Sequence, residues 1–314
     1  MLRIRPFSQE ADRESYVRIF NAAFADYEDM RSMTIEQLRK MEESPRYDPE
    51  GLIMAEWTNQ PAGMVHAYVD KFREEPKGFI QGLAVLPEFR RKGIARKLVE
   101  ASLQNLKQRG MKLVHAWAQS DREACVHLFE SFGFRPVRVT YMMMRSLDNI
   151  PSAMEENKEV TLRKMRKEDE DDVALLNWLD NETFKEHFNF RPKTVEETKY
   201  DLLEMPWFKE QDVLFAYLSD QAVGYGIAGV DCDLNKEKNL KWGWILDIGV
   251  LKSHRNKGIG ICLMLHMMNL LTGKSMEEAV LYVDETNPTK AIQLYQKLGF
   301  RLFRKHFIYE LALT

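Results

Sequence analysis

Cysteine is scarce in this chain. Its 314 residues include three cysteines, Cys125, Cys232 and Cys262, which are too far apart for a CxxC zinc or redox motif. An odd number of cysteines also argues against the disulfide framework of a small secreted protein. We therefore expect reduced cysteines, no metal site and a cytoplasmic location.

Long apolar runs and a charge excess are missing too. The longest apolar run, residues 259–271, is shorter than a bilayer span and is interrupted by His266, and the N-terminal MLRIRPF has no apolar signal core. Residues 1–150 carry 23 basic and 21 acidic side chains, and the rest of the chain carries 22 and 27. Neither half has the basic excess typical of nucleic-acid binding. We therefore expect no membrane partner and no nucleic-acid partner.

Length and composition favour two globular domains. With 45% hydrophobic and 30% charged residues, the chain resembles an ordinary globular protein. A chain of 314 residues is long for one core, whereas two domains of about 150 residues would have the usual size.

Short signals recur in the same order in both halves: Ile4-Arg5 and Leu162-Arg163, Ala62-Gly63 and Val223-Gly224, Gly93 and Gly258, Gly133-Phe134 and Gly299-Phe300. Repeats of this length are whole domains. We predict domains at 1–147 and 160–314, joined by a linker at 148–159, and we expect residues 136–144 to form the closing strand of the first domain.

Residues 244–260 are the most informative stretch. Residues 245–251 are mostly apolar or β-branched and predict a buried strand, within which Asp247 is the one acid. A basic turn follows at 255–258, and residues 259–271 then predict a helix. The first backbone N–H groups of a helix lack internal partners and lie at the positive end of its dipole, so this helix start suits a phosphate. The alternative is a basic turn whose glycine only permits close helix packing.

Two further signals favour the phosphate interpretation. The pattern recurs at residues 81–95, as an apolar run, a basic turn and a glycine that opens a helix. Residues 283–300 supply a strand end and a short helix that carries Tyr295. We expect Asn287 to cap that helix, with Pro288 in its first turn.

The combination of Arg255-x-x-Gly258-x-Gly260 with Asn287, Tyr295 and Gly299-Phe300 resembles the GNAT superfamily of acetyl-CoA-dependent N-acetyltransferases. The resemblance covers nearly the whole chain as two domains in tandem. This layout is similar to that of mycothiol synthase, but the similarity does not identify the substrate. The resemblance implies an α+β (mixed α/β) fold, in which each domain has a mixed, mostly antiparallel sheet flanked by helices. It also implies acetyl-CoA as the cofactor.

The resemblance also assigns residues to coenzyme A. In the family, the basic turn grips the pyrophosphate and the preceding strand contacts the pantetheine arm. In the second half, the corresponding residues are Ile248, Gly249, Val250, Arg255, Asn256, Lys257, Gly258, Ile259, Gly260, Asn287 and Ala291. In the first half, they are Leu83, Ala84, Val85, Arg90, Arg91, Lys92, Gly93, Ile94 and Ala95.

Acetylation of an amine needs a base, because an alkylamine with a pKa of about 10 is protonated near pH 7. Asp247 lies on the strand beside the expected thioester and is our candidate. Asp284 and Glu285, at the end of the next strand, are its substitutes. A carboxylate paired inside the fold is the alternative role for Asp247. In the family a main-chain N–H stabilises the oxyanion, and Val250 is the corresponding position.

Tyr295 is the candidate acid. In the family a tyrosine on this helix faces the thioester sulfur, from which it can protonate the departing thiolate. Ala291 lies one helical turn before Tyr295, and a small residue there leaves room for the pantetheine arm. A tyrosine packed in the core is the alternative.

The first half lacks both proton-transfer groups. The positions that match Asp247 and Tyr295 are occupied by Gly82 and Phe129, whereas the basic turn is retained. We therefore expect this half to hold coenzyme A without turnover and to support or shape the second site. An active first half is the alternative.

The acceptor is the least determined part of the prediction. A small-molecule primary amine is our first expectation, and a protein N-terminus or lysine is the second, because no extended charged groove for a peptide stands out. A non-catalytic acyl-CoA sensor or scaffold is a third interpretation. The aromatic segment 181–193, with Trp207-Phe208, either lines the amine pocket or packs the two halves together.

Overall fold

The computed structural model describes residues 1–151, 159–208 and 210–313. The chain forms two compact units, one of Met1–Val139 with Lys305–Thr314 and the other of Thr140–Arg304. Most of the predicted linker at 148–159 lies outside the described residues. The predicted domains follow the sequence duplication, whereas each compact unit combines segments from both halves.

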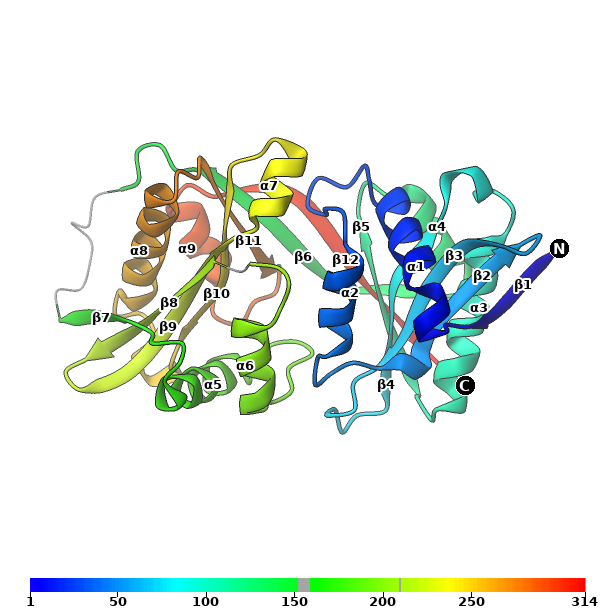
Figure 1. Ribbon diagram of the computed structural model, residues 1–314. Coiled ribbons are helices and arrows are strands. Elements are labelled where there is room, and N and C mark those ends of the chain that lie inside the picture. The colour runs from blue at the N-terminus through cyan, green and yellow to red at the C-terminus, as the bar shows by residue number, and fades with distance from the viewer. Residues whose placement is uncertain (152–158, 209, 314) are drawn as a thin grey trace. The chain divides into compact units, whose positions relative to one another are not determined.

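The sheet of the first unit has the order β1-β2-β3-β4-β5-β12 (Figure 1). Strands β4 and β5 pair in parallel, and the other neighbours in this unit are antiparallel. The strands are β1 (Leu2–Pro6), β2 (Leu52–Trp57), β3 (Gln60–Val69), β4 (Lys77–Val85), β5 (Leu113–Gln119) and residues 305–312 of β12 (Arg301–Ala312). The helices are α1 (Gln9–Ala23), α2 (Ile35–Glu42), α3 (Ile94–Gln108) and α4 (Glu123–Ser131), with 3₁₀ turns at Pro49–Gly51 and Pro87–Phe89.

The second unit repeats this plan, with the strand order β6-β11-β10-β9-β8-β7. Strands β10 and β11 pair in parallel and the others antiparallel, so both units have the mixed, mostly antiparallel sheet that the sequence predicted. The strands are residues 140–146 of β6 (Arg135–Ser146), β7 (Val160–Lys164), β8 (Glu210–Leu218), β9 (Gln221–Val230), β10 (Trp242–Val250) and β11 (Glu278–Asp284). The helices are α5 (Glu170–Phe184), α6 (Val195–Leu203), α7 (Cys232–Lys238), α8 (Ile259–Gly273) and α9 (Ala291–Lys297), with a 3₁₀ turn at Lys252–His254.

The closing strands differ from the prediction. Residues 136–144 were expected to close the first domain, but residues 140–146 of β6 pair with β11 in the second unit. Conversely, residues 306–312 of β12 pair with β5 in the first unit. Alternating side chains identify a strand and its buried face, but they do not identify the strand beside it. The prediction of a strand was correct, and its assignment to the first domain's sheet was wrong.

Capping residues explain where several helices begin. In the sequence, Thr34 followed three residues later by Gln37 predicts a capping box at a helix start. The structure confirms it, since the Thr34 hydroxyl accepts a hydrogen bond from the Gln37 N–H at 3.2 Å. Thr194 and Glu197 form the same box at the start of α6. Helix α7 was not predicted, although Asp231 caps it by accepting from the Leu234 N–H at 3.0 Å.

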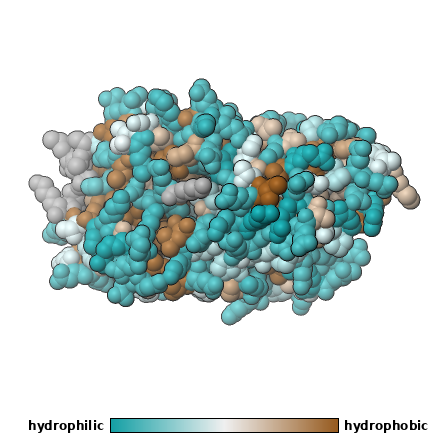
Figure 2. All heavy atoms as spheres, in the orientation of Figure 1, coloured by the Kyte–Doolittle hydropathy of each residue, from teal (hydrophilic) through white to brown (hydrophobic). Residues whose placement is uncertain are grey.

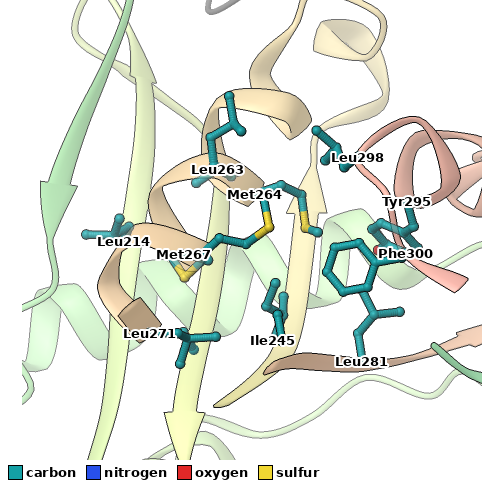
Figure 3. Close-up of a cluster of buried hydrophobic side chains, with 14 of the residues drawn as sticks. Leu214, Ile245, Leu263, Met264, Met267, Leu271, Leu281, Tyr295, Leu298 and Phe300 are labelled. Carbon is teal, nitrogen blue, oxygen red and sulfur yellow. The ribbon is translucent and has the colours of Figure 1, made fainter. Parts of the chain in front are cut away.

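In the second unit, helices cover both faces of the sheet (Figure 1). Helix α8 is apolar on most sides and packs its methionines and leucines on one face. Figure 3 shows this cluster, with Leu263, Met264 and Met267 on α8 and Tyr295 on α9. Helix α5 packs on the opposite face, against Phe215 and Tyr225.

The surface is predominantly hydrophilic on the face shown in Figure 2, where hydrophobic residues occur in small groups. Across the described ranges, every helix is too short or too polar to cross a bilayer. The described residues also contain no cluster of three or more His, Cys, Asp or Glu that could hold a metal. All three cysteines are free thiols.

Candidate active site

A gap opens between strands β10 and β11 of the second unit. The two strands pair over residues 242–244 and 278–280, but β10 continues to Val250 and β11 to Asp284. A cavity of about 700 Å³ lies at this divergence, lined by residues 245–250 and 281–284. The end of α5, the start of α8 and the region around the start of α9 complete its walls. The register of β10 against β9 also shifts at Leu246, and such a bulge bends the strand locally.

The predicted phosphate turn forms one wall of this cavity. Gly258 has a left-handed conformation (φ 80°) and immediately precedes α8, and Asn256 is also left-handed (φ 63°). Glycine adopts this conformation without the steric cost that a side chain brings. The first N–H groups of α8 therefore lie beside the cavity, at the positive end of the helix dipole. Of the predicted turn residues, Arg255, Asn256, Gly258, Ile259 and Gly260 line the cavity, and Lys257 is exposed.

Arg255 holds the turn in place. Its Nε donates to the Val250 carbonyl at 3.2 Å, and its Nη2 donates to the Thr183 carbonyl at 3.2 Å. Its Nη1 lies 3.0 Å from a carboxylate oxygen of Glu186. These contacts join the end of β10 to the end of α5, so much of the hydrogen-bonding capacity of Arg255 is used within the protein.

Asp247 lies where β10 begins to diverge from β11, and it lines the cavity. Burial raises its pKa to about 7, with Lys193 opposing the shift and Asp180 and Asp201 adding to it. Near neutral pH a substantial fraction of this carboxyl group is therefore ionised, and the protonated form is also accessible. A group with its pKa near the working pH is well suited to general base catalysis.

Tyr295 lies in the same cavity wall. It is 8% exposed, follows Ala291 by one turn of α9, and packs its ring 6.0 Å from that of Phe300 (Figure 3). Burial and the nearby charge of Asp247 raise the pKa of Tyr295 to about 12. The phenol therefore stays protonated at physiological pH and can donate a hydrogen bond.

The start of α9 differs from the prediction. Asn287 was predicted to cap this helix, but α9 begins at Ala291 with Lys290 at the cap position. The Asn287 side chain instead accepts from the Thr289 N–H at 2.8 Å, a local turn that competes with capping. Asn287 nevertheless lines the cavity. The Glu285 carboxylate accepts a hydrogen bond from Tyr141 and is absent from the cavity lining formed by the described residues.

The sequence did not single out several side chains that the fold brings to this site. Phe184 and His187, with rings 4.5 Å apart, both line the cavity. They belong to the α5 end and to the aromatic segment for which a pocket role was one of two interpretations. Phe208 instead packs on Trp244 within the second unit, with ring centroids 6.0 Å apart. Burial, and then Arg255, lower the pKa of His187, which favours its neutral form.

The first unit repeats the turn without counterparts of Asp247 and Tyr295. Arg90 donates to the Val85 and Ala23 carbonyls, each at 3.3 Å, which reproduces the two backbone contacts of Arg255. Gly93 is left-handed (φ 76°), like Gly258. Gly82, at the position matching Asp247, is also left-handed (φ 57°). The duplicated feature is therefore the geometry of the turn.

Two parts of the chain match known family models. Residues 14–134 match the acetyltransferase (GNAT) family, and residues 209–302 match the acetyltransferase (GNAT) domain. The chain belongs to the GNAT family and carries two GNAT domains in tandem. This confirms the family and the tandem arrangement that the sequence motifs predicted.

Curated relatives and solved structures agree with this assignment. A mycothiol acetyltransferase from Thermobispora bispora is 32% identical over 46% of this chain, an alignment that spans about half (50%) of that relative's length. One from Renibacterium salmoninarum is 27% identical over 82% of this chain and 79% of the relative. The same fold occurs in a GCN5-related N-acetyltransferase from Sphaerobacter thermophilus, with a TM-score of 0.71 and 20% identity over 99% of this chain and 95% of that one. A tandem GNAT protein from the clavulanic acid biosynthesis pathway has a TM-score of 0.73 and 12% identity over 99% of this chain and 98% of that one.

Proposed function

We propose that this tandem GNAT protein is an acetyl-CoA-dependent N-acetyltransferase that acetylates a primary amine of a small molecule in its second unit. One observation carries the proposal. A single cavity is lined by a left-handed glycine turn at a helix start, by Asp247 and by Tyr295. An anion site, a candidate base and a candidate donor are thus brought together where two strands diverge.

The residues around the cavity fit coenzyme A. Its volume of about 700 Å³ is within the range of ligand sites. The turn at Gly258 would hold the phosphates through backbone N–H groups, and the diverging edge of β10 (Ile248, Gly249 and Val250) would hold the arm that carries the thioester. When bound, acetyl-CoA supplies an acetyl group activated as a thioester.

Asp247 would remove the proton that keeps the amine from reacting. An alkylammonium ion has a pKa of about 10, so only about one molecule in a thousand is neutral at pH 7. Asp247 accepts a proton, the neutral nitrogen bonds to the carbonyl carbon, and the carbon–sulfur bond breaks. The second proton of the attacking nitrogen is then available to the departing thiolate.

Tyr295 would act as a hydrogen-bond donor to that sulfur. Its pKa of about 12 lies above the value of roughly 8.5 for a thiol, so complete transfer of the phenol proton to a thiolate is unfavourable. A donated hydrogen bond stabilises the departing charge without that cost. Tyr295 can also relay a proton, because it can accept one from the attacking nitrogen as it donates its own to the sulfur.

The relatives support a small acceptor. The name mycothiol acetyltransferase describes proteins that align with up to 82% of this chain, and a small-molecule acceptor is the expectation that this name favours. The identity of the amine is tested directly by incubating the purified protein and acetyl-CoA with a panel of small primary amines, amino sugars and peptides. Release of free thiol and mass spectrometry of the product report acetylation.

The panel separates the three interpretations. Acetylated small amines support the proposal, and acetylation confined to peptides would replace it with protein acetylation. Saturable binding of acetyl-CoA by calorimetry with no acetylated product would instead identify a sensor or scaffold. Asp247→Asn serves as the low-activity control.

A further inference from the structure

A polar network lies next to Asp247, on the α5 side of the sheet. The Lys193 Nζ is 2.9 Å from Asp180 Oδ2, and the Tyr225 hydroxyl donates to Asp180 Oδ1 at 2.7 Å. The Asp180 side chain is 13% exposed and Tyr225 is completely buried. The three groups come from α5, from the segment between α5 and α6, and from β9.

The sheet register brings Asp247 to this network. In the antiparallel pair of β9 and β10, Gly249 is opposite Tyr225 and Asp247 is opposite Ile227. Opposite residues share a face of the sheet, and Tyr225 and Ile227 both pack with residues of α5. A side chain at Gly249 would meet Tyr225 at 2.6 Å, so this glycine makes room for the phenol two residues from Asp247.

The backbone of Lys193 is fixed by two asparagines of α5. Its N–H donates to Asn181 Oδ1 at 2.8 Å, and its carbonyl accepts from the side chains of Asn177 and Asn181 at 2.9 and 3.0 Å. The next residue, Thr194, caps α6. Lys193 therefore enters the network from a fixed point in the backbone.

The first unit has the same frame without the charges. Asn21 holds the backbone of Met33 through bonds of 2.7 and 3.0 Å, and Thr34 caps α2. Met33 thus stands where Lys193 stands. By the same spacing Phe20 stands for Asp180, and by the strand registers Met64 stands for Tyr225. By its spacing from Val85, Gly82 stands for Asp247, and the register of β3 and β4 shifts at this point. The frame forms without a lysine, so the charge of Lys193 is not needed to build it.

We propose that Lys193, held in place through its backbone by Asn177 and Asn181, is a positioning residue whose ammonium group stabilises the carboxylate form of Asp247 and so sets the pH at which the second unit becomes active. The inference rests on the proposed role of Asp247 as base. The segment between α5 and α6, which carries Lys193, would then control the charge state of Asp247.

The electrostatics around Asp247 support this assignment. Burial disfavours the carboxylate, and Asp180 and Asp201 add repulsion, whereas Lys193 attracts. On the other side lies the phenol of Tyr295, which stays neutral. Burial lowers the pKa of Lys193, but the three carboxylates around it outweigh this effect, so the ammonium form is retained.

The test is a direct titration of Asp247 by ¹³C NMR of the aspartate carboxyl carbons, with Asp247→Asn assigning the signal. Lys193→Met should raise the titration midpoint by about one pH unit or more, the usual effect of losing a close opposite charge. Asp180→Asn should lower it, because a repelling charge is removed. Lys193→Arg should stay near wild type. Lys199→Met is the matched charge control and should cause no shift. It removes an exposed lysine of α6 that is paired with Glu170 of α5.

Lys193→Met and Asp180→Asn should shift the midpoint in opposite directions. Structural damage does not depend on the sign of the charge that is removed, so opposite shifts indicate electrostatic control. An unchanged or lowered midpoint in folded Lys193→Met would overturn the proposal. Thermal unfolding checks the fold, and Lys193→Gln takes the place of the Met variant if that variant does not fold. The titration needs no turnover, so shifts in an inactive protein would support the network while refuting the proposed function. In an active protein, the acidic limb of kcat/KM should move with the NMR midpoint.

Discussion

Asp247→Asn should change the shape of the pH profile as well as its height. Because the pKa of Asp247 is about 7, the ionised fraction falls roughly tenfold for each pH unit below that value. If the carboxylate takes a proton from the bound ammonium, wild-type kcat/KM rises with a slope of one up to about pH 7. It then stays level until the substrate itself loses its proton at about pH 10.

The variant can acetylate only amine that is already neutral. That fraction is about one in a thousand at pH 7 and grows tenfold per pH unit. We therefore expect a loss of about 10²- to 10³-fold at pH 7, within the range for general base catalysis, and a steady recovery towards pH 10. The variant's profile should be a single rising line without a bend near neutrality.

The assay is the initial rate of thiol release at subsaturating amine, from about pH 5.5 to about pH 10. Asp220→Asn, in the exposed turn between β8 and β9, is the matched control and should follow wild type. Glu285→Gln tests the substitute base and should also follow wild type, because Glu285 is held by Tyr141. If Asp247→Asn keeps the change of slope near pH 7 and stays within about threefold of wild-type kcat/KM at that pH, Asp247 is not the base. If Glu285→Gln loses the change of slope, Glu285 is the base instead.

Four further outcomes follow from the structure. Tyr295→Phe should lower kcat by about 10- to 100-fold while acetyl-CoA binding and thermal stability stay close to wild type, as measured by kinetics, calorimetry and melting, because only a hydrogen bond is lost. Gly258→Ala forces a side chain into a left-handed position (φ 80°) at a cost of about 1–2 kcal/mol, so it should weaken acetyl-CoA binding in calorimetry. Gly260→Ala, whose added methyl group would make an ordinary contact with Leu294, should leave binding unchanged. Asp247→Asn should raise the melting temperature at pH 8 but not at pH 4. The pKa of Asp247 is about 7 in the folded protein and about 4 in the unfolded chain, so above about pH 4 the unfolded state ionises first and the folded state loses stability. The Asn variant avoids this penalty of up to a few kcal/mol. Deletion of Lys305–Thr314 should unfold the first unit, seen as a lost or lowered melting transition, because β5 loses its antiparallel neighbour.

Features that depend on neighbours in sequence were predictable. A glycine between a basic turn and an apolar run indicates a left-handed residue at a helix start, and Gly258 and Gly93 both have that conformation. The capping box at Thr34 was read directly from its spacing to Gln37. Asn287 shows the limit of such reasoning, because an asparagine before Pro-Thr can either cap a helix or close a turn on the threonine.

Features that depend on distant neighbours were not predictable. The partner of β6 is a strand more than a hundred residues away, and its own side-chain pattern is compatible with either sheet. The pKa of Asp247 depends on Lys193, Asp180 and Asp201, which lie on other elements of the unit. Sequence reasoning found the candidate base, but its electrostatic surroundings exist only in the folded unit.

The two units also change what the basic turn can be taken to mean. Arg255 and Arg90 make the same pair of backbone contacts, from the end of the strand to the end of the first helix. Such contacts stabilise the turn whether or not a phosphate is bound, so retention of the arginine in the first unit is explained by folding alone. The groups that differ are the ones to which we assign proton transfer and its control, since Asp247 and Lys193 are matched by Gly82 and Met33. Coenzyme A binding by the first unit is therefore a separate question from catalysis, and Gly93→Ala should separate the two. It should reduce the acetyl-CoA stoichiometry in calorimetry from two sites per chain to one, without moving the acidic limb of the pH profile that the second unit sets.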